Sequence, residues 1–478
     1  MPKNTFDLSR RKFIHRTTAA TAAVAAGSLV TNADLEALSA NVNTNSKPSD
    51  LKITDMRLVQ LDVGGWHQYI LRLDTNQGLV GWGELHTGAS KRYALMLKSR
   101  IMGMNPCNVD QIFRKIKQFG NHGRQGAGVS SIEMACWDLA GKAWGVPVWQ
   151  MLGGQFRDKV MIYCDTQGSS DPVVLGNRLK DRMELGYKFL KMDVQITSIF
   201  GKVPGALTFP AGNEEAVYNQ YMDVPFNKLM HPFKGIRITK KGLGLVKEFV
   251  GTVRDIVGMD IPLAIDHFGH FLVEDCIKIA NTLEEFNLAY LEDMLPWQLT
   301  DQYARLKNAV KTPILTGEDI FCADGFRDLF EKQAISMCHP DIGPCGGCLE
   351  MKKVGDLAME HGINMMIHNA GLPPMMMASV HTAAATENFM ALEHHHVDET
   401  DLGYDDLYDG IKKPLVQDGY IPTPTGPGLG FELNLDVAKE LMIKKEGWFE
   451  PTDEWDDESA HDRQWSLNPE RKLNTNHA

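Results

Sequence analysis

The sequence has no dense cluster of lysine or arginine, and its 49 basic residues are outnumbered by 61 acidic residues. The formal net charge of -12 therefore argues against nucleic acid as a partner. No stretch approaches about 18 consecutive apolar residues, so we expect no membrane-spanning helix in the mature protein. The eight cysteines are scattered through apolar stretches and are expected to be mostly buried free thiols. Cys345-Gly-Gly-Cys348 has no second CxxC motif to complete a zinc site, and we favour a loop over a redox or zinc motif.

The N-terminal region carries a pattern typical of a targeting segment. Ser9-Arg10-Arg11-Lys12-Phe13-Ile14 precedes a weakly apolar Ala/Thr run over Thr17–Val30, which is too short and polar to span a bilayer. The pattern resembles a twin-arginine export signal, and the alternative is an ordinary basic helix. We interpret residues 1–40 as this signal, which implies export to the periplasm and no membrane association after its removal.

The remaining chain, long enough for two domains, changes its pattern near residue 155. Alternation predicts strands over Leu51–Val63, Tyr69–Asp74 and Gly78–Glu84, and a 3.6-residue period predicts a helix over Ser130–Trp144. Residues 51–155 therefore form an expected α+β domain. From residue 156 onward, short apolar strands alternate with amphipathic helices, as in Leu263–Ile265 then Val273–Thr282, and Ile314–Thr316 then Gly325–Lys332.

Ionisable residues recur where these later strands are expected to end. The residues are Asp266, Glu292, Glu318, Asp341, His368 and Glu393. Successive members are 26, 26, 23, 27 and 25 residues apart, which is the length of one strand, one helix and their loops. This spacing predicts a (β/α)₈-type barrel with its active site at the C-terminal strand ends. Lys191 and Asp193 end an earlier strand and Asp165 ends the first, which leaves an insertion over about residues 197–242.

Three of these carboxylates lie on consecutive predicted strands and would converge at one point. Asp266, Glu292 and Glu318 would repel one another unless a hard cation neutralised them, and oxygen ligands suit Mg²⁺. We therefore predict one Mg²⁺ per subunit at this point. The alternative is that each residue is a helix cap or an ion-pair partner.

The motifs around these carboxylates are those of a known family. Ala264-Ile265-Asp266, Tyr290-Leu291-Glu292-Asp293 and Leu315-Thr316-Gly317-Glu318 resemble the metal-ligand motifs of the enolase superfamily, with the mandelate racemase-like branch as the nearest fit. The resemblance covers nearly all of residues 51–440. It implies α/β architecture, a modified (β/α)₇β barrel over residues 156–415 and an α+β capping domain over residues 51–155. Residues 416–478 would return to the capping domain and end in an acidic, Trp-containing tail.

The resemblance also implies roles for the other strand-end residues. His368 matches the base that removes the proton α to a carboxylate, and Asp341 matches the residue that orients it. Glu393 matches a position that hydrogen-bonds the substrate carboxylate, for which we expect it to be protonated. Asp165, Lys191, Trp66 and His67 are further candidates for substrate binding, the last two in an expected loop between the first strands.

Two departures from the family pattern bear on the reaction. The usual Lys-x-Lys is Lys191-Met192-Asp193 here, so an aspartate replaces the second base and racemisation is disfavoured. After Asp266, His267 and His270 are candidates for the acid that protonates a leaving hydroxyl, and packing near the metal is an equally good interpretation.

These residues together predict a Mg²⁺-dependent acid-sugar dehydratase acting on an aldonate or aldarate and forming a 2-keto-3-deoxy acid. The alternatives are a cycloisomerase or epimerase of the same superfamily, or a non-catalytic, metal-stabilised sugar-acid-binding protein. A small carboxylate is the expected partner, and the resemblance implies a homo-oligomer.

Overall fold

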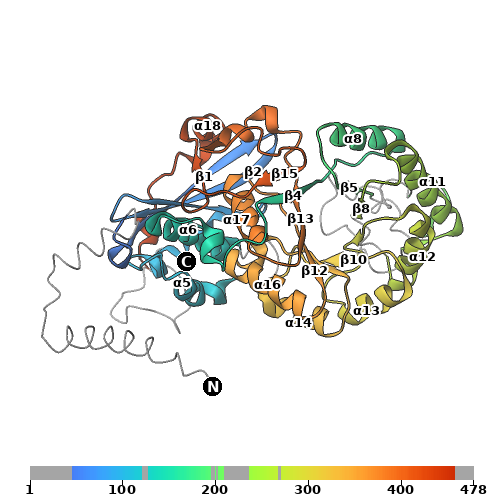
Figure 1. The fold of residues 1–478 in the computed structure, drawn as a ribbon, viewed down its shortest axis with the longest axis horizontal. Coiled ribbons are helices and arrows are strands. Elements are labelled where there is room, and N and C mark those ends of the chain that lie inside the picture. The colour runs from blue at the N-terminus through green and yellow to red at the C-terminus, as the bar shows by residue number, and fades with distance from the viewer. Residues whose placement is uncertain are drawn as a thin grey trace, which may run out of the picture. The chain divides into compact units, whose positions relative to one another are not determined.

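A three-stranded antiparallel sheet opens the part of the chain that the computed structural model describes, namely residues 46–120, 127–194, 200, 203–208, 236–266 and 271–457. Its strands are β1 (Ile53–Val63), β2 (Trp66–Thr75) and β3 (Val80–Leu85) (Figure 1). The turn between β1 and β2 consists of Gly64 and Gly65, both with positive φ, and the Asp62 side chain accepts a hydrogen bond from the Gly65 N–H. The three strands predicted here are confirmed within a few residues.

Helices pack on one face of this sheet. They are α3 (Lys91–Leu95), α4 (Lys98–Ile101), α5 (Val109–Ile116), α6 (Ala127–Trp144) and α7 (Val148–Met151). A Cβ at Gly83 of β3 would lie 2.0 Å from the Ser131 carbonyl oxygen of α6, so glycine permits this close approach. The apolar residues between the sheet and α6 form a hydrophobic core of their own.

Eight parallel strands close into a barrel, as predicted. They are β4 (Lys159–Cys164), β5 (Leu190–Asp193), β8 (Leu263–Asp266), β9 (Leu291–Glu292), β10 (Ile314–Thr316), β11 (Met337–Cys338), β12 (Asn364–Ile367) and β13 (Phe389–His394). Each strand pairs with the next in chain order, and β13 pairs with β4 to close the ring. A short strand, β15 (Tyr420–Pro422), adds to β4 in antiparallel orientation. With an N-terminal capping domain, this is the enolase-type architecture that the sequence predicted.

The helices between the strands cover the outside of the barrel (Figure 1). They are α8 (Pro172–Glu184), α11 (Lys240–Val257), α12 (Val273–Leu283), α13 (Thr300–Ala309), α14 (Cys322–Glu331), α15 (Ile342–Cys345), α16 (Cys348–Glu360) and α17 (Pro373–Ala384). Asp171 caps α8 and Thr239 caps α11, each accepting a hydrogen bond from a first-turn N–H. Most of the predicted insertion over residues 197–242 lies outside the described residues. Its described ends pair as β6 (Leu207–Thr208) and β7 (Arg237–Ile238).

The C-terminal segment returns to the N-terminal sheet. It contains β14 (Tyr408–Asp409), β16 (Glu432–Leu433) and α18 (Leu435–Glu440). The Asp62 N–H donates to the Leu441 carbonyl at 2.9 Å, and the Ile443 N–H donates to the Gln60 carbonyl at 2.9 Å. These two hydrogen bonds join the C-terminal segment to β1, and the predicted domain division stays a prediction.

Two further sequence predictions concern cysteines and the membrane. All eight cysteines are free, and seven of them are buried, with Cys107 partly exposed. Among the described residues no helix combines the length and apolar character needed to cross a membrane. The predicted export signal falls in residues 1–45, outside the described residues.

Candidate active site

The inside of the barrel is built in two layers, one apolar and one polar. The apolar layer takes one residue from each strand or the residue just before it: Tyr163, Phe189, Ala264, Tyr290, Leu315, Met337, Met366 and Ala391. Side chains along a strand alternate between its two faces, so the residue two positions further on also points inward. Those residues are Asp165, Lys191, Asp266, Glu292, Gly317, His339, His368 and Glu393. A layer of ionisable groups therefore lies toward the C-terminal strand ends, directly above the apolar layer.

Two of the three predicted metal ligands, Asp266 and Glu292, lie in this polar layer, and the third, Glu318, directly follows its member Gly317. Asp266 and Glu292 end β8 and β9, and Glu318 follows β10. Carboxylate oxygens of Glu292, Asp293 and Glu318 lie within 4.8 Å of one another. Burial raises the pKa of Glu292 well above its usual range, and the Asp266 carboxylate adds to the rise. A buried, mutually repelling set of oxygen donors fits a hard divalent cation.

Lys191 supplies positive charge at the centre of this carboxylate group. Its Nζ lies 3.1 Å from Asp266 Oδ2, 3.3 Å from Glu292 Oε2 and 2.5 Å from Glu393 Oε1. Burial lowers the pKa of Lys191, but the carboxylates of Glu292 and Glu393 outweigh burial and raise it well above its usual value. Asp193 lies at the end of the same strand, and it contributes to the raised pKa of the neighbouring Asp165.

The predicted His–Asp dyad is present. His368 Nδ1 lies 2.6 Å from Asp341 Oδ2, and a β-bridge between these two residues holds their backbones together. Asp341 Oδ1 accepts a hydrogen bond from the Gly343 N–H at 2.7 Å. Burial raises the pKa of Asp341, but His86 and His368 outweigh burial and hold it well below its usual range. An ionised Asp341 orients the ring of His368. The other ring nitrogen, His368 Nε2, then faces the Glu318 carboxylate at 3.1 Å.

The expected protonation of Glu393 is not what the structure indicates. Burial by itself raises the pKa of Glu393, as the sequence analysis assumed. The Lys191 ammonium and the His395 imidazole outweigh burial, however, and hold the pKa well below its usual range. In this structure Glu393 is therefore an ionised carboxylate that pairs with Lys191 and His395. The sequence did not reveal that these two side chains lie against it.

Trp66 and His67 differ from their predicted setting, since they begin β2 rather than lie in a loop. Their backbones pair with Val63 and Asp62 because the two-glycine turn is shorter than expected. The Trp66 ring lies edge-on to His395, with ring centroids 5.8 Å apart, and so borders the polar layer. The His67 side chain is half exposed and contacts Asp62 at 3.3 Å. The structure therefore brings Trp66 to the site and leaves His67 on the sheet surface.

Three histidines of the site were not identified as site residues from the sequence. His339 Nδ1 lies 2.5 Å from Glu292 Oε1, and His339 Nε2 lies 2.6 Å from the Tyr163 hydroxyl. His339 could have been identified from the sequence, because it lies two residues beyond the inward apolar residue Met337. His86 follows β3 and lies 3.3 Å from Asp341, and no sequence pattern indicated that contact. His395 directly follows β13 and is the second of three consecutive histidines. His267 and His270, the predicted acids, lie outside the described residues.

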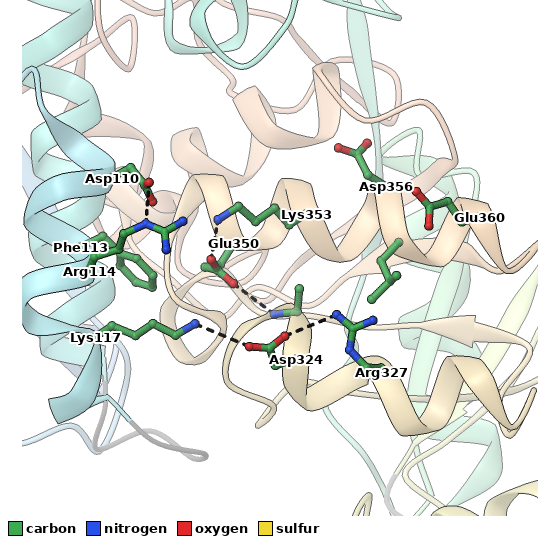
Figure 2. A pocket seen from close by; sticks show the side chains of 12 residues that line it. Asp110, Phe113, Arg114, Lys117, Asp324, Arg327, Glu350, Lys353, Asp356 and Glu360 are labelled. Carbon is green, nitrogen blue, oxygen red and sulfur yellow. Dashed lines mark hydrogen bonds and ion pairs between the residues drawn. The ribbon is translucent and has the colours of Figure 1, made fainter.

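Pockets are found beside the site and away from it. One of about 290 Å³ adjoins the carboxylate cluster, lined by Asp293, Trp297 and Glu318 among others. Another of about 380 Å³ lies between α5, α14 and α16 on the outside of the molecule. Figure 2 shows ion pairs among several of its charged residues, with Lys117 and Arg327 both directed at Asp324.

Comparison with known proteins gives a consistent result. Residues 40–153 match the mandelate racemase / muconate lactonizing enzyme N-terminal domain, and residues 215–437 match the enolase C-terminal domain-like family. The chain is 30% identical over 411 residues to a D-xylonate dehydratase of Haloferax volcanii, covering 84% of this chain and 91% of that protein. It is 25% identical to a D-galactonate dehydratase family member of Salmonella virchow, covering 84% and 95%. A mandelate racemase/muconate lactonizing enzyme-like protein of Rubrobacter xylanophilus superposes with a TM-score of 0.72 at 27% identity, covering 84% of this chain and all of that one.

Proposed function

Because the chain belongs to the mandelate racemase and muconate lactonizing enzyme family of the enolase superfamily, we propose that it is a Mg²⁺-dependent acid-sugar dehydratase. The observation that carries the proposal is the convergence, inside one barrel, of the carboxylates of Glu292, Asp293 and Glu318 with the Asp-oriented His368. The Asp266 carboxylate also acts on Glu292. Relatives named as dehydratases of D-xylonate and D-galactonate support an aldonate as the substrate.

The residues of this chain divide the work of the reaction. Asp266, Glu292 and Glu318 would hold the cation. When bound, Mg²⁺ supplies the charge that stabilises a carboxylate substrate as it becomes an enediolate. His368 removes the α-proton through Nε2, because Nδ1 is held by Asp341.

Lys191 neutralises charge beneath the substrate carboxylate. It is buried among carboxylates and keeps its proton, so it acts as a fixed positive charge rather than as a second base. With Asp193 in place of the second lysine, a base for the opposite face is missing from its usual position. One-base elimination to a 2-keto-3-deoxy acid is therefore favoured over racemisation.

The test is proton NMR of the purified protein with Mg²⁺ in D₂O against aldonic, aldaric, uronic and anhydro-sugar acids. Loss of an α-proton signal together with growth of a 3-deoxy methylene establishes dehydration and names the substrate. Exchange or rearrangement without the methylene assigns an epimerase or a cycloisomerase instead. Ligands that raise the melting temperature without any reaction assign a binding protein.

Export to the periplasm and homo-oligomer formation complete the proposal. Export is supported by Arg10-Arg11 and the Ala-rich run that follows, both in the segment before the family match begins at residue 40. Oligomer formation is supported by the family resemblance alone, and sedimentation velocity of the mature protein tests it.

A further inference from the structure

His395 lies between two carboxylates at the edge of the polar layer. It directly follows β13, and its side chain is 16% exposed. Nε2 lies 3.3 Å from Glu393 Oε1, and Nδ1 lies 3.5 Å from Asp165 Oδ2. Asp165 follows β4, the strand paired with β13, so ring closure of the barrel brings the three residues together. Among the described residues, His395 Nε2 has no hydrogen bond of good geometry, although it is nearly inaccessible to water.

The two neighbouring histidines have different surroundings. His394 Nδ1 lies 3.0 Å from the Tyr187 hydroxyl, and the His396 ring stacks on Tyr404 with centroids 4.7 Å apart. Burial lowers the pKa of His394 well below its usual value and that of His396 to about 3, so both are neutral core residues. Burial also lowers the pKa of His395, but Asp165 and Glu393 outweigh burial and raise it above its usual value. Of the three consecutive histidines, His395 is the one whose ring faces two carboxylates and whose pKa is raised.

His395 lies beside the base. The rings of His368 and His395 have centroids 5.5 Å apart, and one nitrogen of each lies within 4.8 Å of the other and of a Glu393 oxygen. Each imidazole is paired with its own aspartate, Asp341 for His368 and Asp165 for His395. A group bound next to His368 Nε2 therefore also comes within reach of His395.

We propose that His395 is the general acid of the elimination, an inference that rests on the proposed function. His368 takes the α-proton, and the electron pair of that C–H bond forms the enediolate. The electron pair of the enediolate then forms a C=C bond between the α- and β-carbons, and the β-C–O bond breaks. The departing oxygen takes its proton from His395 Nε2 and leaves as water. The enol product then tautomerises to the 2-keto acid, and solvent at the exposed edge returns a proton to His395.

Among the described residues of the polar layer, Lys191 and His339 are the other nitrogen-bearing side chains besides the proposed base His368, and both are already engaged. The Lys191 side chain is 1% exposed, and its Nζ lies within 4.0 Å of carboxylate oxygens of four residues, which neutralise its charge. His339 is fully buried, with its two nitrogens facing Glu292 and the Tyr163 hydroxyl. His395 combines a raised pKa, partial exposure and a ring nitrogen without a good hydrogen bond.

The experiment separates the two half-reactions in a His395→Asn variant. The substrate is the acid of the NMR panel with the highest turnover, followed in D₂O with Mg²⁺. We expect α-proton exchange within about threefold of wild type, and dehydration slower by about 10²- to 10⁴-fold, the usual range for a lost general acid. The 3-deoxy-3-fluoro analogue of the same acid should rescue elimination, because fluoride leaves with little help from a proton. His361→Asn, at the outer end of α16, is the matched control and should behave as wild type.

Three outcomes overturn the inference. Dehydration at the wild-type rate in His395→Asn removes the acid role. Equal loss of exchange and dehydration in both His395→Asn and His395→Gln, at wild-type melting temperature, makes His395 a positioning residue. Failure of the fluoro analogue to rescue elimination in His395→Asn would likewise show that His395 is not the proton donor. If the wild-type protein dehydrates no acid of the panel, it is instead the proposed function that fails, before any variant is compared.

Discussion

Asp341 connects the capping domain to the chemistry of the barrel. Its Oδ2 atom lies 2.6 Å from His368 Nδ1 and 3.3 Å from His86 Nε2, and its Oδ1 atom caps the turn at Gly343. A carboxylate held at both oxygens cannot rotate freely, so the His368 ring inherits a fixed orientation. The capping domain supplies His86 and thereby takes part in positioning His368, the proposed base.

Replacing the base tests this arrangement at the residue scale. In His368→Asn, we expect α-proton exchange to fall by about 10²- to 10⁴-fold, because the side chain that accepts the proton is gone. Mg²⁺ binding should persist, since the three metal-ligand carboxylates are unchanged. Proton NMR in D₂O measures exchange, and calorimetric titration measures Mg²⁺ affinity. Normal exchange in this variant would rule out His368 as the base.

Removing one carboxylate of the metal cluster gives a second prediction at this scale. Wild-type protein should gain stability when Mg²⁺ is added, by about 2.7 kcal/mol at one hundred times the dissociation constant. Glu292→Gln should lose most of this gain, because a ligand and its charge are removed from a buried site. Thermal unfolding with and without Mg²⁺, before and after chelation, measures the effect. Glu284→Gln, on the surface next to Lys311, is the matched control. An equal Mg²⁺ effect in both variants would contradict the assigned site.

At the scale of elements, two buried glutamates of the capping domain hold the first turns of barrel helices. Glu84 of β3 accepts hydrogen bonds from the Leu372 and Met375 N–H groups at the start of α17. Glu133 of α6 accepts them from the Cys348 and Leu349 N–H groups at the start of α16, at 2.8 and 3.0 Å. These N–H groups have no partners within their own helices, so the glutamates satisfy them across the domain contact.

The close approach of α6 to α16 depends on a glycine. Gly347, which precedes α16, has a φ of +92°, and a Cβ there would lie 2.0 Å from Glu133 Oε2. Any larger residue would push the carboxylate away from the first turn of α16. The sequence Cys345-Gly-Gly-Cys348 is thus a helix-to-helix joint with buried thiols, in agreement with the favoured interpretation as a loop.

The Glu133 contact predicts a pH-dependent stability. Burial raises the pKa of Glu133 to about 7 despite the hydrogen bonds it accepts. Between the unfolded value near 4.5 and about 7, the folded state binds more protons than the unfolded state. The contribution of Glu133 to the free energy of unfolding is therefore full below pH 4.5 and falls by about 3 kcal/mol as the pH rises to 7.

A non-titrating replacement isolates this contribution. Glu133→Gln should be destabilised by about 1–3 kcal/mol at pH 5, because its amide NH₂ faces N–H donors. The difference from wild type should shrink as the pH rises, since only the wild type loses stability through proton release. Urea unfolding from pH 5 to pH 8 measures both free energies. A difference that grows with pH would show instead that Glu133 is ionised in the folded protein.

At the scale of the whole molecule, the chain combines an export pattern with a barrel that contains a cluster of carboxylates. The twin-arginine-type pathway implied by the resemblance carries proteins that are already folded. Replacing Arg10 and Arg11 by lysine should leave the protein in the cytoplasm of a bacterial host, because the paired guanidinium groups are lost while the charge is kept. Cell fractionation and immunoblotting measure the location. Lys3→Gln, in the same segment, is the control, and periplasmic protein from the Lys–Lys variant would contradict the signal assignment.

The order of the strands followed from the sequence alone, and so did the expectation that the three predicted metal ligands lie at neighbouring strand ends. Apolar strands followed by helices of nearly constant length force ionisable strand ends onto one rim of a closed sheet, so Asp266, Glu292 and Glu318 were predictable as neighbours. The His368–Asp341 pair came from the family resemblance and is confirmed as a contact at 2.6 Å.

Only the tertiary structure decided which charges compensate one another. Ring closure of β13 on β4 places Asp165 beside His395, although 230 positions separate the two residues, and capping-domain docking places His86 against Asp341. The same packing brings Lys191 to Glu393 and reverses the protonation expected for that carboxyl. Local patterns report which face of an element is buried. The pKa of a buried group depends on charges that the fold brings from elements distant along the chain, and no local pattern carries that information.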